Sequence, residues 1–435
     1  MKFYDNFLKL LRRRDDGQLT SAIVDSTDDA LHRSYSLYCS EVSGSGLSLG
    51  LASGIVSELS RLTLTEFELT YGSRPCDALL GDALYGLESR IRSVVELGCA
   101  TGGVMLKPCY DGKRLSVTVF SPFDFIPLGT DRSGCIDECA FLFRHSHGGK
   151  KFVRVEEHRR EGDGYVITNR AYISDGSATP CPLSSVPAWS GIAESCRIER
   201  LKRPLFAYFG MPGADPTSPL SPLGVPVFRR AEGLIREADR QLERLIWEFE
   251  GGELAIDASE DAFRVGKDGN PRLPVGKERL YRTNALDACC STNELMKVFS
   301  PELRDRSIIN GLNRLVMFVE DACGIARGTF SDPSEVAKTA TEVRASRQRT
   351  YSTVRAIQRT LESAILRLVE AMNDLAALYG LWSGTASVSI SMGDGVLNDS
   401  ESVKASWRED VKYGIITADE FKARWHSGKR QGGSN

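Results

Sequence analysis

The most regular pattern of hydrophobic and polar positions lies between Val225 and Cys323. Its first part repeats apolar residues at steps of three and four, which predicts an amphipathic helix over Pro226–Phe249. Charged residues of nearly balanced sign occupy the other positions. Pro226 suits the first position of a helix, and Gly251-Gly252 predicts its end. At about 1.5 Å per residue, this helix would be a rod roughly 36 Å long.

A second amphipathic helix is predicted after Ser300-Pro301, ending before Gly324. Residues 251–300 separate the two rods and contain two short strand-like runs, Leu254–Ile256 and Arg279–Thr283. Each helix has more apolar surface than the other would cover, so we expect the remainder to contact neighbouring copies of the chain. The predicted contact residues on the apolar stripes are Leu234, Leu242, Ile246, Ile309, Leu312 and Val316.

The N-terminal part of the chain changes from a helical to a strand-like period. Leu49–Leu64 and Ala78–Leu97 each show one helical stripe, and from Val104 onward apolar residues alternate with polar ones. The pair Asp163-Gly164 lies between two alternating runs and predicts a hairpin turn. We therefore predict an α+β domain up to about Arg203, with helices first and antiparallel strands after them.

Beyond Gly324 the pattern predicts a loop and then a long helix from about Glu335 to Tyr379. Its first half is rich in arginine, and four arginines share one ridge of the helix. The ridge residues are Arg344, Arg347, Arg355 and Arg359. Such a ridge is either a solvated face or a surface that contacts phosphate groups without reading sequence. A strand at Ala386–Met392 and two short helices, Glu401–Gly414 and Thr417–His426, follow.

The composition is that of an ordinary globular protein. Hydrophobic residues make up 41% and charged residues 26% of the 435 residues, and the length suggests about two to four domains. A net charge of −3 argues against a protein held on nucleic acid by bulk positive charge. The 11 cysteines contain no Cys-x-x-Cys pair, so we expect reduced thiols in a reducing cytosol. No run reaches the ~18 apolar residues of a membrane span, so we expect a soluble protein.

The chain shows no motif that indicates catalysis. It lacks a Gly-x4-Gly-Lys-Ser/Thr loop, a Gly-x-Ser-x-Gly elbow and a His-Glu-x-x-His sequence. His145, His147 and His158, with Cys139 in range, could contribute to a zinc site, but neighbouring basic residues oppose a cation. We therefore predict a protein that is not an enzyme and that binds no metal or cofactor.

Six segments of the chain carry a resemblance to a known family. They are Ala100–Pro108, Ser121–Leu128, Pro204–Phe209, Ser221–Gly224, Gly328–Phe330 and Thr339–Val343. The helix, strand-bearing insert and second helix lie between the fourth and fifth segments. In this order, and collinearly from about Ile55 to Val403, the chain resembles the portal proteins of tailed bacteriophages, in particular those of long-tailed phages of Gram-positive hosts.

The resemblance implies a portal fold, in which copies of the chain form a ring, expected to be a dodecamer, at one vertex of the capsid. It implies an α/β wing at residues 1–222 and 325–380, a two-helix stem at 223–250 and 301–324, a small α/β clip at 251–300, and a short crown-like helical segment at 381–435. Double-stranded DNA would pass through the ring during packaging and genome ejection. The implied partners are the major capsid protein, the terminase motor and the head–tail adaptor, in a virion assembled in the host cytoplasm.

By position, residues 325–338 resemble the tunnel loop of that family, which lines the narrowest part of the channel. The implied channel residues are Arg327, Thr329, Asp332, Glu335 and Lys338. Their charges cancel, which suits a DNA strand that must slide, because each added phosphate contact strengthens binding. The alternative from another class is a nucleic-acid-processing enzyme, such as a nuclease or a motor-associated hydrolase. An assembly of about twelve chains would favour the ring, and a monomer with hydrolytic activity the enzyme.

Overall fold

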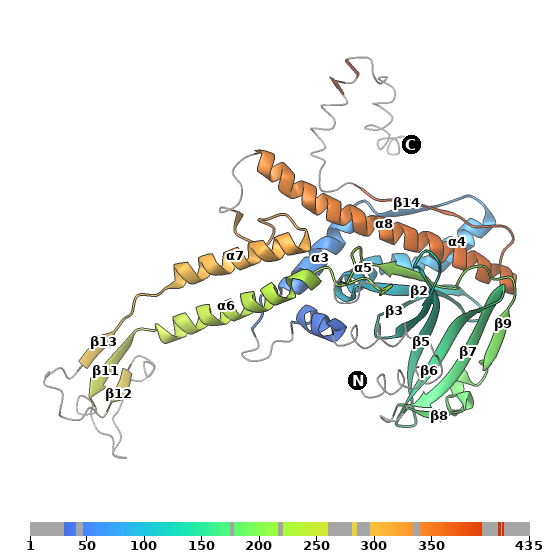
Figure 1. Ribbon diagram of the computed structural model, residues 1–435, viewed down its shortest axis with the longest axis horizontal. Coiled ribbons are helices and arrows are strands. Elements are labelled where there is room, and N and C mark those ends of the chain that lie inside the picture. The colour runs from blue at the N-terminus through green and yellow to red at the C-terminus, as the bar shows by residue number, and fades with distance from the viewer. Residues whose placement is uncertain are drawn as a thin grey trace, which may run out of the picture.

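The computed structural model describes residues 30–40, 47–174, 178–215, 221–259, 281–284, 296–333, 340–393, 408–409 and 411–412. Their helices and strands are those of an α+β protein, which confirms the predicted fold class. A broad body of helices and sheets carries a two-helix arm with a small sheet at its far end (Figure 1). No helix within the described ranges is long and apolar enough to cross a membrane.

Three consecutive helices form one part of the body. They are α3 (Leu51–Thr63), α4 (Pro75–Glu88) and α5 (Ile91–Thr101). The prediction of a single helix over Ala78–Leu97 is wrong, because the chain turns at Ser89 and Arg90. There the Ser89 hydroxyl group and the Arg90 guanidinium group both donate to the carbonyl oxygen of Gly86, at 3.2 and 3.0 Å. Such bonds from side chains to nearby backbone compete with continuation of the helix.

Two sheets lie beside these helices. Their strands are β2 (Gly103–Tyr110), β3 (Leu115–Phe120), β4 (Phe125–Thr130), β5 (Ile136–His147), β6 (Lys150–Glu161), β7 (Gly164–Ile173), β8 (Thr179–Cys181), β9 (Ser195–Ile198) and β10 (Ala207–Gly210). In the smaller sheet, β2 lies between β10 and β3, and both pairs are antiparallel. The larger sheet has the order β4-β5-β6-β7-β8, with β9 also paired to β7. The predicted hairpin joins β6 to β7, where Glu161 lies opposite Gly164.

The long helix α8 (Ala340–Tyr379) connects the helices of the body to the smaller sheet. Its residues Ile357 and Leu368 are buried in the same apolar core as Ile55 of α3 and Phe209 of β10. Past α8, the predicted strand is confirmed as β14 (Val388–Ser391), which pairs antiparallel with β1 (Glu68–Tyr71).

The arm confirms the predicted succession of helix, strand-bearing insert and helix. Its elements are the 3-10 turn η3 (Arg229–Ala231), α6 (Glu232–Gly251), β11 (Ala255–Ser259), β12 (Tyr281–Asn284), β13 (Met296–Phe299) and α7 (Asp305–Cys323). The strand β11 is central, parallel to β12 and antiparallel to β13. Beyond α7, Gly324 has φ +69°, and a Cβ atom there would lie 2.4 Å from the Thr353 hydroxyl oxygen of α8. Glycine therefore suits this close contact between the end of α7 and α8.

Part of the predicted C-terminal region lies outside the described residues. Of the helix predicted over Glu401–Gly414, residues 408–409 and 411–412 are described, and these are helical. The helix predicted over Thr417–His426 lies outside the described residues, and so do residues 334–339, where the long helix was expected to begin.

Candidate functional site

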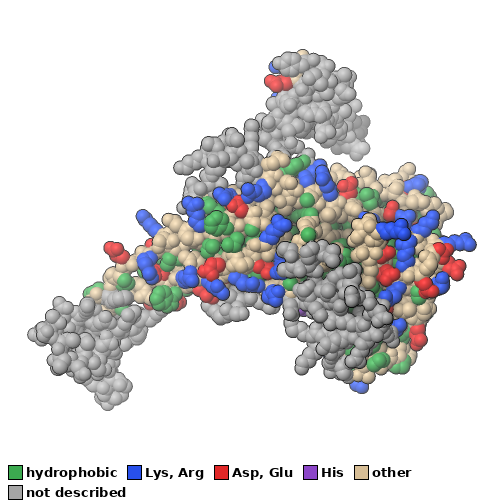
Figure 2. Space-filling view, in the orientation of Figure 1, with side chains coloured by type: hydrophobic (Ala, Val, Ile, Leu, Met, Phe, Trp, Pro, Cys, Tyr) green, Lys and Arg blue, Asp and Glu red, His purple; other side chains and the backbone are tan. Residues whose placement is uncertain are grey.

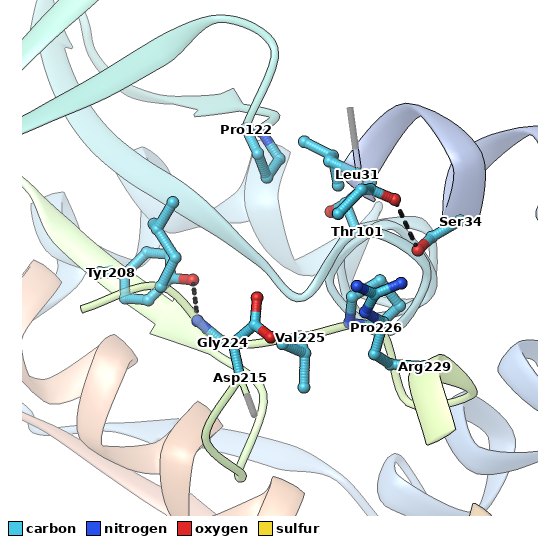
Figure 3. A pocket seen from close by; sticks show the side chains of 12 residues that line it. Leu31, Ser34, Thr101, Pro122, Tyr208, Asp215, Gly224, Val225, Pro226 and Arg229 are labelled. Carbon is cyan, nitrogen blue, oxygen red and sulfur yellow. Dashed lines mark hydrogen bonds between the residues drawn. The ribbon is translucent and has the colours of Figure 1, made fainter. Parts of the chain in front are cut away.

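The root of the arm is tied to the body around Gly224 (Figure 3). The hydroxyl group of Tyr208 donates to the carbonyl oxygen of Gly102 at 3.3 Å and accepts a hydrogen bond from the Gly224 amide at 3.0 Å. The Val227 amide donates to the carbonyl oxygen of Cys99 at the end of α5. Burial raises the pKa of Tyr208, so its hydroxyl group keeps its proton and remains a donor. These bonds fix the start of the arm relative to β10 and α5.

Two buried carboxylates hold the first half of α6 against the body. Glu232 accepts a short hydrogen bond from the Ser34 hydroxyl group. About two helical turns further along, Asp239 accepts hydrogen bonds from the Leu49 amide at 2.8 Å and from the Ser48 hydroxyl group. A buried carboxylate needs such donors, because an unpaired one would be costly to remove from water. The body therefore covers one side of α6 near its root.

At the far end, α6 and α7 are joined by one buried glutamate. The Glu248 side chain accepts hydrogen bonds from the Arg304 amide at 2.9 Å and from its guanidinium group at 3.1 and 2.7 Å. This pairing with Arg304 lowers the pKa of Glu248 to about 2. Midway along the arm, the Gln241 amide group contacts the carbonyl oxygen of Ile308 at 3.5 Å. The two helices thus run antiparallel, with Glu248 beside the start of α7.

The predicted contact residues differ in how far the chain itself covers them. Val316 is buried, and Leu234 and Leu312 are half-buried against the core of the body. Leu242 and Ile246, further out on α6, are half-buried, and Ile309 on α7 is 45% exposed. The apolar stripes of both helices therefore begin in the core and continue along the arm with less and less cover.

Large exposed hydrophobic side chains are concentrated on the arm and the loop after it. Of the 14 that are exposed among the described residues, eight lie between residues 247 and 330. They are Trp247, Phe249, Leu254, Val298, Leu303, Ile309, Phe318 and Phe330. Figure 2 shows hydrophobic side chains scattered among charged ones along the arm. Sequence periodicity placed Ile309 on a contact stripe but gave no reason to select Trp247 or Phe318.

The described part of the implied tunnel loop is held against α7 by Glu320. This carboxylate is fully buried and accepts hydrogen bonds from the amides of Phe330 (2.6 Å), Ser331 (3.0 Å) and Gly328 (3.2 Å), and from the Ser331 hydroxyl group (2.7 Å). Glu320 was not among the residues predicted from the sequence. Its position within the apolar stripe of α7, next to Val319, was the signal that could have identified it.

The charged and polar residues of this loop have different surroundings. The Arg327 guanidinium group pairs with Asp321 at 2.6 Å, and Arg349 of α8 pairs with the same carboxylate. Hydrogen bonding by Arg327, and then by Arg349, lowers the pKa of Asp321. Thr329 is exposed and donates to the carbonyl oxygen of Ala326.

The remaining predicted channel residues are only partly described. Asp332 is exposed, and its amide donates to the Asn313 side chain at 2.7 Å. Glu335 and Lys338 lie outside the described residues. The structure therefore brings Arg327, Thr329 and Asp332 to one surface loop beside α7.

The four predicted ridge arginines all lie on α8, but only two side chains are described. Arg344 and Arg347 belong to the helix, and their side chains are outside the described part. Arg355 is half-buried, donates to Gln358 at 3.2 Å, and lies 5.9 Å from the ring centre of Tyr351. Arg359 is exposed. The two described side chains of the ridge thus differ, because Arg355 contacts other residues of the chain and Arg359 is exposed to solvent.

A buried charged cluster links the two sheets of the body. Glu156 of β6 contacts the Lys107 ammonium group of β2 at 2.9 Å, the Arg154 guanidinium group at 2.8 Å and the His158 ring at 2.8 Å. The attraction of Lys107 and the other donors holds the pKa of Glu156 well below its usual range despite burial. Among the described residues, no group of three or more His, Cys, Asp or Glu could hold a metal ion.

No protein-family model matches the chain, and no curated protein sequence matches it.

Proposed function

We propose that the protein is a subunit of a portal-type ring, through which double-stranded DNA enters and leaves a viral capsid. The observation that carries this proposal is the two-helix arm, whose apolar stripes continue beyond the body and are only partly covered there. Burying a large aliphatic or aromatic side chain contributes roughly 1.5–3 kcal/mol, so a row of partly exposed apolar side chains favours association with a partner that buries them. Exposed ion pairs on the same arm contribute only about 0–1 kcal/mol each.

Head-to-tail contact with further copies of the chain fits this surface better than a two-fold symmetric dimer would. Ile246 and Trp247 are consecutive on α6, so their side chains point about 100° apart, to different faces of the arm. Trp247 is 66% exposed and Ile246 is half-buried. Two different apolar faces on one arm support head-to-tail contact between copies, and head-to-tail contacts generate rings when the rotation closes.

The other assignments follow from the resemblance and stay proposals. The body would be the wing, α6 and α7 the stem, and the small β11–β12–β13 sheet part of the clip, which would dock the terminase motor and later the head–tail adaptor. The loop with Arg327, Thr329 and Asp332 would lie near the channel. The protein would act at the capsid vertex as a conduit and not as an enzyme.

Light scattering during size-exclusion chromatography, with negative-stain images of the same sample, tests the proposal. A closed ring of about twelve copies with a central channel is the expected result. A monomer that hydrolyses DNA or ATP would overturn it in favour of the nucleic-acid-processing enzyme.

A further inference from the structure

The α8 arginines whose side chains are described fall into two groups by what they contact. Arg349 and Arg355 have partners within the chain, as described above. Arg359 and Arg367 are exposed, and neither forms an ion pair with a described residue. They lie eight positions apart on the same helix, which corresponds to a rise of about 12 Å. Their guanidinium groups are therefore available to a ligand.

Arg359 lies beside an open hollow of about 580 Å³ between α8 and the described residues 208–214 and 221–224. Its described lining contains this guanidinium group, serine and threonine hydroxyl groups and three glycines, but no aspartate or glutamate. Of the three glycines, only Gly213 has open space at the position that a side chain would occupy. The hollow thus offers several donors and no competing anion among the described residues.

Two hydroxyl groups of the lining have protons to donate. The Ser221 hydroxyl oxygen accepts a hydrogen bond from the Leu223 amide at 3.3 Å, and no described residue accepts its proton. Ser363, one turn after Arg359, makes no hydrogen bond with a described residue. Thr360 differs from both, because its hydroxyl group donates to the carbonyl oxygen of Ile357 at 2.9 Å.

The adjacent hollow beside Arg367 has a different charge. It measures about 350 Å³ and shares Tyr208 and Pro222 with the first hollow. The carboxylates of Asp131, Asp137 and Glu370 also line it. These groups would repel an anion, so the hollow beside Arg359 is the better anion site of the two.

We propose that the hollow beside Arg359 binds a phosphate group, with Arg359, Ser363 and Ser221 as donors. A phosphate has several acceptor oxygens that point in different directions, and a guanidinium group can donate to two of them at once. The same contacts suit a phosphate of a nucleic-acid backbone and a free phosphate. The site is an addition to the proposed ring function and does not depend on it.

Binding of two probes by the full-length protein tests the site: inorganic phosphate by calorimetry, and a short labelled DNA duplex by fluorescence anisotropy. We expect Arg359→Gln to weaken binding of at least one probe roughly tenfold, and Ser363→Ala to weaken it less. For DNA, the slope of log affinity against log salt should fall by about 1. Arg114→Gln, at an exposed arginine in the β2–β3 turn, is the matched control and should change neither affinity.

The outcomes separate the sources of the phosphate. If Arg359→Gln weakens binding of inorganic phosphate but not of DNA, the site is assigned to a free phosphate. If the variant weakens binding of DNA, the site is assigned to the nucleic-acid backbone. Unchanged binding of both probes by Arg359→Gln, or an equal loss in Arg114→Gln, overturns the proposal. Displacement of both probes by a glutamate-rich peptide would also overturn it, in favour of an acidic protein partner.

Light scattering on the same samples separates this inference from the proposed function. Intact rings with no effect of Arg359→Gln would overturn the phosphate site alone. A monomeric wild-type protein whose phosphate binding depends on Arg359 would support the site and overturn the ring.

Discussion

Gly102 and Gly224 approach so closely that a Cβ atom on either would lie 2.4 Å from the carbonyl oxygen of the other. Gly102 ends α5 with φ +89°, and Gly224 begins the path into the arm. Both also bond to the Tyr208 hydroxyl group. The arm therefore leaves the body at a point where two backbones touch without a side chain between them.

Gly224→Ala should destabilise the protein by about 1–3 kcal/mol, because the added methyl group meets backbone atoms that cannot move aside. Urea unfolding followed by circular dichroism measures this change. Gly86→Ala is the matched control, since Gly86 lies in α4 and a Cβ atom there meets nothing within 4 Å. That variant should be neutral or stabilised by about 0.5–1 kcal/mol. Equal stability of both variants would contradict the close contact.

Glu320→Ala should release the loop from Gly328 to Ser331. Removing the carboxylate leaves the buried amide of Ser331 and its neighbours without an acceptor, which costs about 1–3 kcal/mol. Hydrogen exchange read by mass spectrometry should show faster exchange of the loop amides. Glu362→Ala, at an exposed glutamate of α8, should leave exchange unchanged. Slow exchange in Glu320→Ala would mean that other contacts hold the loop.

The pairing of Glu248 with Arg304 should make the protein less stable in acid. The pKa of Glu248 falls from its ordinary value of 4.5 to about 2 in the folded protein. A group with a lowered pKa stabilises the fold above its unfolded pKa, and this contribution is lost as the pH falls from about 4.5 to 2.

Thermal unfolding of wild type and Glu248→Gln across that pH range measures the effect. The difference in melting temperature between the two proteins should be largest near neutral pH and should shrink as the pH approaches 2. A difference that does not vary with pH would show that Glu248 acts through packing and not through its charge.

Ile309→Asp should prevent assembly without unfolding the chain. Ile309 is 45% exposed, so the isolated subunit loses little when it becomes polar, whereas a ring contact would have to bury a carboxylate. Light scattering should give a monomer whose melting temperature lies within a few degrees of that of unassembled wild type. Leu378→Asp, at a residue of α8 that is 48% exposed, should assemble normally. Normal rings formed by Ile309→Asp would remove this stripe from the interface.

Periodicity identified the long helices well because their stripes are local properties of the sequence. The helices α6, α7 and α8 appear where apolar residues repeat at steps of three and four. Short strands such as β8 and β9, of three and four residues, gave too little alternation to be recognised. The turn between α4 and α5 was missed because side-chain bonds to Gly86, and not glycine or proline, interrupt the helix.

The charged face assigned to α6 shows the limit of such patterns more clearly. Its sequence separates apolar from charged positions, yet the charged Glu232 and Glu248 are buried. Arg229, three positions earlier, pairs with Glu232, but the Ser34 hydroxyl group beside Glu232 and the Arg304 guanidinium group beside Glu248 come from distant parts of the chain. Burial of a carboxylate depends on donors that only the tertiary fold brings near, so no local pattern could distinguish these glutamates from solvated ones.

The antiparallel course of α6 and α7 has an electrostatic consequence. The peptide dipoles of a helix leave roughly half a positive elementary charge at its start and half a negative one at its end. At the tip of the arm, the end of α6 lies beside the start of α7, and these partial charges nearly cancel. The arm therefore carries almost no dipole along its length. In the ring proposed above, the backbone of the stem would neither draw a charged polymer inward nor drive it out.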